Sequence, residues 1–341
     1  MQTVLANNRQ TRRRIHIRPN LTIMKGTIAD LKFVRYGDMV VPIIMGKERR
    51  RVINSIVPQG LNQYVNDLLA VNNLGYQMYK ASGSSSIISI SGWNSSPGNV
   101  IQLLNNGSVV QTLTATVIPT LNGSTVIWVF IASDLSSASY TANQVNLFAS
   151  VNNVNSLSGS GVVQYSPAFN LATATTSIVK QSGETISFIW EIQLNLGSYA
   201  LTDFIIGILY SIPTVQTTCA GSNVIQGTFG GVHQLGFGAP YFFFSIVLQY
   251  IGGSSSGDIS SITTTYDGTN TYLVMSALIS LSSQVTATSV IVNVSYEGGN
   301  SYFCINGQQL TSGSAMQIPY NATLPSGTYN VTVTIEFSPA T

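Results

Sequence analysis

Residues 183–194 read Gly-Glu-Thr-Ile-Ser-Phe-Ile-Trp-Glu-Ile-Gln-Leu, and residues 268–279 read Gly-Thr-Asn-Thr-Tyr-Leu-Val-Met-Ser-Ala-Leu-Ile. Each segment is a glycine turn followed by a run of β-branched and aromatic residues, which is typical of a buried β-strand. Each continues to a tyrosine, Tyr210 or Tyr296, which lies 27 or 28 residues after the glycine. The matched spacing predicts that these two parts of the chain are copies of one β-sandwich, with residues 173–253 superposing on residues 254–341.

A cysteine follows each tyrosine, Cys219 in one copy and Cys304 in the other. Equivalent positions in neighbouring domains lie a domain length apart, so we expect two unpaired, buried thiols. A looser third copy begins at Gly123.

The rest of the chain also favours strands. Four Asn-Gly or Asp-Gly pairs, beginning at residues 106, 122, 267 and 306, separate apolar runs and predict hairpin turns. Gly/Ser-rich breaks at 81–86, 156–161 and 252–258 suggest domain boundaries. We therefore predict a mainly β protein of tandem antiparallel β-sandwiches, jelly-roll or immunoglobulin-like, after a small basic domain that contains one helix. The expected domains are 1–80, 81–172, 173–253 and 254–341.

The first 80 residues have their own pattern. Short strands are expected at 15–17, 21–24 and within 31–45. Pro58 then opens a predicted helix, whose apolar residues recur at helical spacing. These residues are Leu61, Tyr64, Val65, Leu68 and Leu69.

Charge divides the chain sharply. Charged residues make up only 8% of it, and 13 of the 14 Lys and Arg precede residue 81, which gives that segment a net charge of +9 and the remainder −7. Four acids cannot neutralise 13 cations, so we expect the basic clusters to contact an anionic partner: lipid head groups, nucleic acid or an acidic protein surface. The candidate contact residues are Arg9, Arg12, Arg13, Arg14, Arg18, Lys47, Arg49, Arg50 and Arg51.

The composition argues against enzymes and metal proteins. The acids of the β region are scattered singly, and the nearest pair, Glu184 and Glu191, has an odd separation that places the two on opposite faces of a strand. His233 has no neighbouring Ser or Asp that would suggest a catalytic triad. With two His and two Cys in the chain, we predict no catalytic residue, no metal site and no cofactor.

Two further patterns bear on location. The first 20 residues lack the apolar core of a secretory signal, and no apolar run reaches the roughly 20 residues that span a bilayer, so synthesis in the cytoplasm is expected. Asn-x-Ser/Thr sequences occur about as often as the composition predicts by chance. The candidate N-glycosylation sites are Asn94, Asn106, Asn122, Asn293, Asn321 and Asn330.

The Arg-rich start, the Gly-Gly-Ser-Ser-Ser-Gly segment at 252–257 and strand endings such as Tyr-Asn-Val-Thr-Val-Thr-Ile-Glu-Phe at 329–337 resemble the vertex proteins of turreted icosahedral viruses of thermoacidophilic archaea. The resemblance covers the whole chain in style and contains no fixed motif. In that family of penton-base and turret proteins, tandem jelly rolls project from the capsid, and the base packs against the shell and an internal membrane.

The resemblance implies a virion structural protein, a penton-base or turret subunit. Its residues 1–80 would anchor in the shell, with membrane or nucleic acid as further contacts, and its sandwiches would project outward toward a host receptor. The partners would be itself, as a homo-oligomer such as a pentameric ring, and other capsid proteins. The alternatives are an archaeal adhesin, pilus or sheath subunit, and a virus tail or receptor-binding protein.

Overall fold

The computed structural model describes residues 3–5, 12–36, 39–46, 48–66, 98–122, 125–150, 152–154, 163–165, 167–195, 224–225, 241–297, 302–305, 308–310 and 313–340. These residues are mainly β-strand, as predicted, with an α-helix at 58–66 and a short 3-10 helix, η2 (Ile28–Asp30). The strands are β1 (Thr3–Leu5), β2 (Arg12–Gly26), β3 (Leu31–Tyr36), β4 (Met39–Ile44), β5 (Glu48–Val52), β6 (Asn54–Ile56), β7 (Val100–Asn105), β8 (Ser108–Thr114), β9 (Thr116–Asn122), β10 (Thr125–Asp134), β11 (Tyr140–Ala149), β12 (Asn152–Val154), β13 (Val163–Tyr165), β14 (Phe169–Lys180), β15 (Thr185–Asn195), β16 (Val224–Ile225), β17 (Tyr241–Tyr250), β18 (Gly253–Tyr266), β19 (Thr271–Leu281), β20 (Val285–Glu297), β21 (Tyr302–Ile305), β22 (Gln308–Leu310), β23 (Gly313–Leu324) and β24 (Gly327–Pro339).

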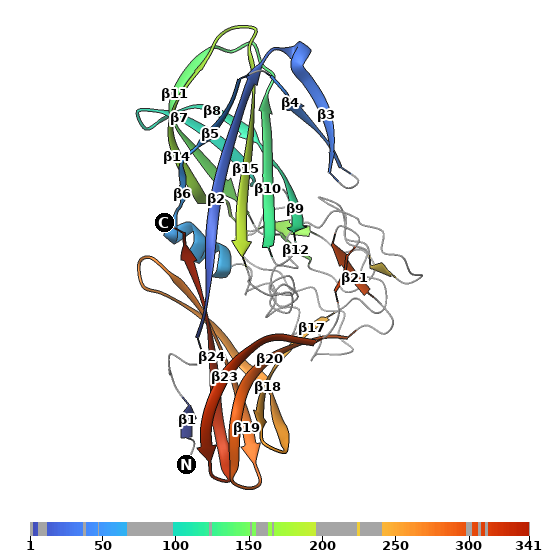
Figure 1. Cartoon of the computed structure of the whole chain (residues 1–341). Helices are drawn as coiled ribbons and strands as arrows, with labels where there is room; N and C mark the ends of the chain where they lie inside the picture. The colour runs from blue at the N-terminus through green and yellow to red at the C-terminus, as the bar shows by residue number, and fades with distance from the viewer. Residues whose placement is uncertain are drawn as a thin grey trace.

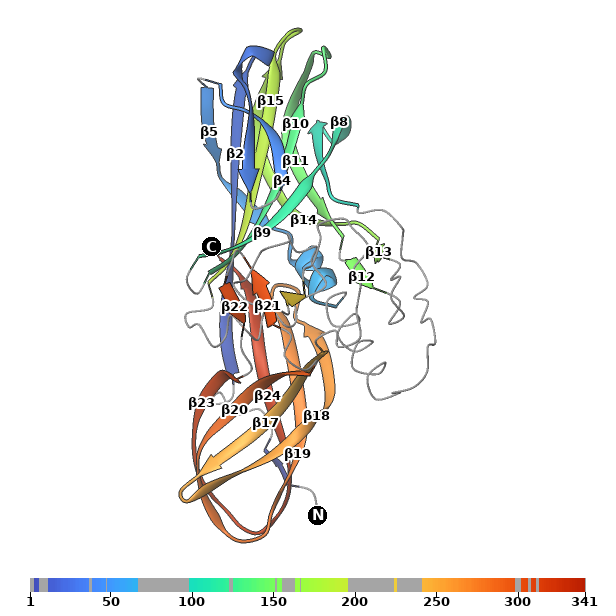
Figure 2. The same cartoon turned by 90° about the vertical axis from the view of Figure 1, so that its right-hand side faces the viewer.

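The strands form two lobes stacked end to end, the upper lobe and the lower lobe of Figures 1 and 2. In the upper lobe, strands β9, β10, β15, β2 and β5 make one layer, and strands β6, β14, β11, β7 and β8 make the facing layer. The pairing is nested in sequence, because β2 and β15 pair in one layer, whereas β6 and β14, which lie between them in the chain, pair in the other layer. Inward side chains such as Phe188, Trp190 and Leu147 are fully buried between the layers.

The lower lobe is a single curled sheet with the strand order β23, β20, β17, β18, β19 and β24. Alternate residues of these strands fill its interior, which is why β19 shows a strict buried and partly exposed alternation from Thr271. Gly268, with φ +96°, lies in the turn that joins β18 to β19, where a left-handed conformation favours glycine. The Asp-Gly hairpin predicted there is confirmed, as is the hairpin at Asn106 and Gly107.

Strand β2 belongs to both lobes. Its first half pairs in parallel with β24 of the lower lobe, from Arg12 opposite Thr334 to Ile17 opposite Pro339. Its second half pairs with β15 and β5 of the upper lobe. β1 extends the same edge by pairing with β24, so the N-terminal segment supplies an outer strand to the C-terminal sheet.

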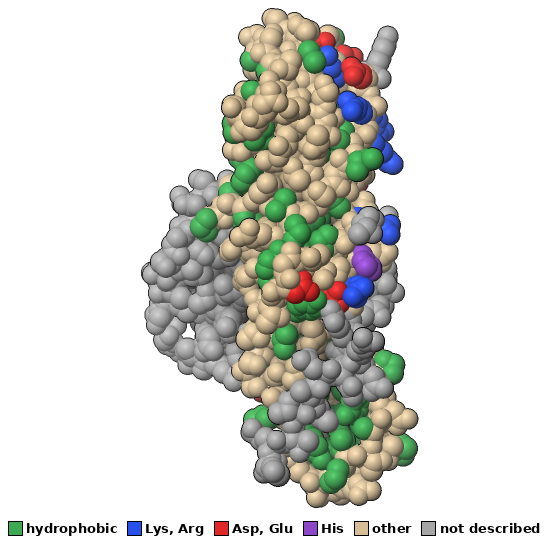
Figure 3. All heavy atoms as spheres, turned by 90° about the vertical axis from the view of Figure 1, so that its left-hand side faces the viewer, with side chains coloured by type: hydrophobic (Ala, Val, Ile, Leu, Met, Phe, Trp, Pro, Cys, Tyr) green, Lys and Arg blue, Asp and Glu red, His purple; other side chains and the backbone are tan. Residues whose placement is uncertain are grey.

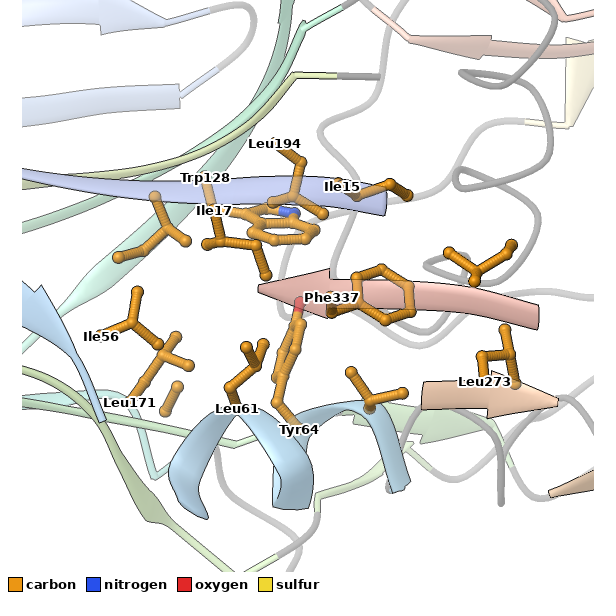
Figure 4. Packing of buried hydrophobic residues seen from close by; sticks show 14 of the residues in the cluster. Ile15, Ile17, Ile56, Leu61, Tyr64, Trp128, Leu171, Leu194, Leu273 and Phe337 are labelled. Atoms are coloured by element: carbon orange, nitrogen blue, oxygen red, sulfur yellow. The ribbon is translucent and has the colours of Figure 1, made fainter. Parts of the chain in front are cut away.

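The helix fills the junction between the lobes (Figure 4). Leu61, Tyr64 and Val65 are buried, as the sequence pattern predicted, while Leu68 and Leu69 lie outside the described residues. The Tyr64 ring meets Trp128 edge-on with centroids 5.3 Å apart and lies 5.9 Å from Phe169. One continuous hydrophobic cluster therefore runs from the upper lobe through the helix to Phe337 of the lower lobe.

A hairpin of β3 and β4 covers the outer face of the upper lobe. Val41 and Ile43 of β4 pack against Val129 and Ile131 of β10 in a second, smaller cluster. Both faces of β10 are thus buried, which accounts for its nearly continuous apolar sequence.

The observed pairing corrects the expected division into four domains. The segment 1–80 is no separate base, because β2 and β6 pair with strands of both later regions. The boundary expected at 253 falls inside the β17–β18 hairpin, whose strands pair through Tyr250 and Gly253. Gly and Ser at 252–257 therefore form a tight turn and the first part of β18, and they do not form the predicted domain boundary.

The described strands also do not form the two equivalent sandwiches that were predicted for residues 173–253 and 254–341. β15 and β19 each follow a turn glycine with positive φ, Gly183 or Gly268, as the repeated sequence predicted. However, β14 and β15 are strands of the upper lobe, whereas β17 pairs with both β18 and β20 of the lower lobe. Cys219 lies outside the described residues, and Cys304 lies in β21.

Candidate functional site

Three cationic or titratable side chains alternate along β2. Arg14, His16 and Arg18 are exposed, whereas the intervening Ile15 and Ile17 are buried. Because side chains alternate between the two faces of a strand, the three exposed residues share the outer face of the sheet.

Strand β5 extends this set. Arg51 is opposite Thr22 and Arg49 is opposite Met24, and residues that are paired in an antiparallel ladder project from the same face. Residues 14 to 24 of β2 span about 33 Å at the rise of an extended strand. We call Arg14, His16, Arg18, Arg51 and Arg49 the basic row, which contributes to the line of Lys and Arg side chains along one edge of Figure 3.

Little negative charge opposes the basic row. The Arg14 Nε lies 2.9 Å from Oε1 of Glu336, a carboxylate that is buried and also accepts a hydrogen bond from Ser338. Glu191 is held by the amides of Asn20 and Gln193. Among the described residues, no ion pair joins Arg18, Arg49 or Arg51 to a carboxylate.

Large exposed apolar side chains also occur in the segment that contains β3, β4 and β5. Five residues between 28 and 53 are more than half exposed, and Ile53, at 94%, continues the alternation of Arg49 and Arg51 onto the same face. The β3–β4 hairpin covers this face too, because its smaller hydrophobic cluster includes Met24 of β2. The five apolar residues are Ile28, Phe33, Val40, Met45 and Ile53.

Not every predicted contact residue lies on this face. Arg14, Arg18, Arg49 and Arg51 come together as described, but Arg50 points the other way and donates from Nη1 to the carbonyl oxygen of Ser177, 3.2 Å away. Arg12 and Arg13 are in β2, with side chains outside the described part of the chain, as are Arg9 and Lys47. The apolar neighbours were missed by sequence reasoning, although Ile53 directly follows the arginines with the correct alternation.

The candidate glycosylation sites differ in exposure. Asn106 is exposed in the turn between β7 and β8, and Asn321 is exposed in β23. Asn293 and Asn330 are half-buried in β20 and β24. Asn94 and the side chain of Asn122 lie outside the described residues.

A buried ionic cluster, which sequence reasoning missed, closes the far end of the upper lobe. Lys180, which is 1% exposed, donates from Nζ to the carbonyl oxygens of Ser136 (2.6 Å) and Ala138 (2.7 Å), and Nζ lies 3.9 Å from Oδ2 of buried Asp134. Burial tends to raise the pKa of Asp134, but hydrogen bonds from Ser136 and Gln111 outweigh it, so this pKa lies below its usual value. The cluster fastens the β10–β11 loop onto the end of β14.

The described residues contain no group of three or more His, Cys, Asp or Glu suited to a metal ion. A backbone hydrogen bond from Gln181 and an ion pair with Lys25 at 2.8 Å lower the pKa of the Glu184 carboxyl. His233 lies outside the described part, and no described helix is long and apolar enough to cross a membrane.

Comparison with known proteins identified no relative. A scan against family models, a search of curated proteins and a search of solved structures all returned no match.

Proposed function

We propose that the chain is a structural subunit of a virus particle, a capsid-vertex protein of the penton-base or turret kind. In this role the face that carries the basic row anchors the subunit against the anionic surface of its surroundings. The lower lobe projects away from that surface.

The observation that carries the proposal is the alignment of the basic row on one face, mostly of the upper lobe. The basic row has few acids to pair with, so it is stabilised by an external anion more than by water. Ile53 and Phe33, which are 94% and 70% exposed, add apolar surface that a partner can cover. Apart from Arg14 of β2, the lower lobe carries no described Lys or Arg side chain, and many of its exposed positions are Ser, Thr, Asn and Gln.

Rigidity supports the same role. β2 and the helix at 58–66 connect the two lobes through backbone pairing and a continuous core, so a load on one lobe reaches the other without a hinge. This differs from a string of three sandwiches on flexible linkers. The two outermost nested pairs of the upper lobe, β2–β15 and β6–β14, lie in different sheets, as in a jelly roll, whereas the next pair, β7–β11, stays in the sheet of β6 and β14.

The proposal is tested by fractionating a culture that produces the protein into cell envelopes, filaments and purified particles, with quantitative mass spectrometry of each fraction. We expect the chain in the particles, in a constant ratio to the major capsid protein. Enrichment in envelopes or filaments, with none in particles, would replace this proposal by that of an adhesin, pilus or sheath subunit.

A further inference from the structure

The outer edge of the β3–β4 hairpin has backbone groups aimed at open space. On β4, the Ile44 N–H donates to Ser187 Oγ (2.8 Å) and the Pro42 carbonyl accepts from Ser133 Oγ (2.8 Å), so both residues direct their backbone polar groups away from β3. Residues opposite one another in an antiparallel ladder share this orientation. The partners in register, Leu31 and Phe33 of β3, therefore direct theirs away from β4.

Nothing in the described structure occupies that side. β4 is the only described strand that pairs with β3, and β3 is the outermost strand on the right of the upper lobe in Figure 1. The Phe33 side chain is 70% exposed, so the surrounding chain does not cover it. A row of unpaired backbone groups on such an edge is a template for another strand.

Other sheet edges carry features that discourage pairing. β9 contains Pro119 and β23 contains Pro319, each of which lacks an N–H. β8 is bent by a bulge where its pairing with Leu103 and Leu104 shifts register. By contrast, β3 pairs in unbroken register over its whole length and contains no proline.

The packing of β4 against the sheet fixes the position of the hairpin and of the β3 edge. Val41 and Ile43, which are 4% and 1% exposed, anchor β4 on the outer face of β10. β3 is consequently held in an extended conformation before any partner arrives, which lowers the entropic cost of binding.

Charge selects the partner. Lys32, next to Phe33 in sequence, is exposed and cationic. The acids of this chain are sparse, because its two closest, Glu184 and Glu191, are seven residues apart in sequence, so a second copy supplies at most one carboxylate in any six-residue segment. A segment of another protein that alternates acidic and apolar residues places several carboxylates on the face of Lys32 and apolar side chains on the face of Phe33.

We propose that β3 binds such a segment by β-strand addition, with backbone hydrogen bonds at Leu31 and Phe33, apolar contact at Phe33 and carboxylates toward Lys32. The inference goes beyond the proposed function, and it is tested on the purified chain without particles.

The probe is a fluorescein-labelled, end-capped peptide of seven residues that alternates Val and Glu, and an alternating Val–Lys peptide of equal length is its control. We expect saturable binding of the Val–Glu peptide alone. Amide exchange, read by NMR, should slow by about tenfold at Leu31 and Phe33, while Lys32 and Val34, already bonded to β4, change little.

Two substitutions at one position separate backbone pairing from side-chain contact. Phe33→Pro removes the outward N–H without breaking a bond to β4, and Phe33→Ala keeps that N–H. The affinity for the Val–Glu peptide should be about tenfold lower in F33P than in F33A, because one backbone hydrogen bond is lost. Equal melting temperatures of the two variants would show that both fold.

Three results would overturn the inference: no binding of the Val–Glu peptide, equal binding of the two peptides, or equal affinity of F33P and F33A. Each of them leaves the particle fractionation unaffected, so failure here is distinguishable from failure of the proposed function.

Discussion

Tyr64→Ala should destabilise both lobes. Tyr64 is 6% exposed, and its ring meets those of Trp128 and Phe169 at the junction. Removing a buried aromatic side chain costs about 3–5 kcal/mol through lost contacts and the cavity left behind. The upper end of this range is expected, because the neighbouring Leu61 and Trp128 are fixed in separate elements and cannot collapse into the space.

The assay is urea unfolding followed by two probes. Tryptophan fluorescence reports on the upper lobe through Trp128 and Trp190, and amide exchange at Val331 and Val333 reports on the lower lobe. Because one hydrophobic cluster spans the junction, both probes should shift together by the same free energy. Gln59→Ala, at an exposed position of the same helix, is the control and should change little. A loss confined to the tryptophan signal would refute the continuous core.

Three further predictions concern charged groups. Lys180→Met should cost about 3–5 kcal/mol in thermal or urea unfolding, because it leaves Asp134 buried without its cation; an unchanged stability would show that the cluster is dispensable. Because the pKa of Asp134 is lowered in the folded state, the ionised carboxylate stabilises the fold at pH values above its unfolded pKa, about 4. This stabilisation is lost as the pH falls through the pKa of Asp134 in the folded state. The melting temperature should therefore decrease below about pH 4, and it should decrease less steeply in Asp134→Asn. The double substitution of Arg49 and Arg51 by Gln should weaken binding to inorganic polyphosphate and make that binding less dependent on salt concentration. Lys25→Gln is the control and should change neither, because Lys25 is on the opposite face and is already paired with Glu184.

Local patterns predicted local structure well. The helix after Pro58 and the hairpins at Asn106 and Asp267 follow from capping, periodicity and turn chemistry that act within a few residues. Arg14, Arg18, Arg49 and Arg51 also fall on one face, because alternation along a strand is a local property.

Long-range pairing was not predictable in the same way. Ile15 to Ile17 and Leu21 to Met24 read as two short strands, yet they form one strand because β24, β15 and β5 pair along its length. Nothing in the sequence of β2 says that its first half joins a strand more than 300 residues away in the chain. The repeated glycine turns at 183 and 268 reflect a shared strand type, which two different sheets can use.

The buried Lys180 cluster illustrates another limit. A single lysine among Ser and Thr reads as a solvated residue, and only the fold brings the carbonyls of Ser136 and Ala138 to its Nζ. The exposed position of Ile53 is likewise a consequence of an edge strand that the sequence alone does not identify.

The orientation of the subunit in a particle tests the central claim most directly. A density map of purified particles at a resolution that separates strands would place the two lobes relative to the shell. We predict that the basic row and the outer face of the β3–β4 hairpin contact the shell or the layer beneath it, with the lower lobe directed outward. A map in which the basic row faces open solvent while the lower lobe lies buried in the shell would contradict the account.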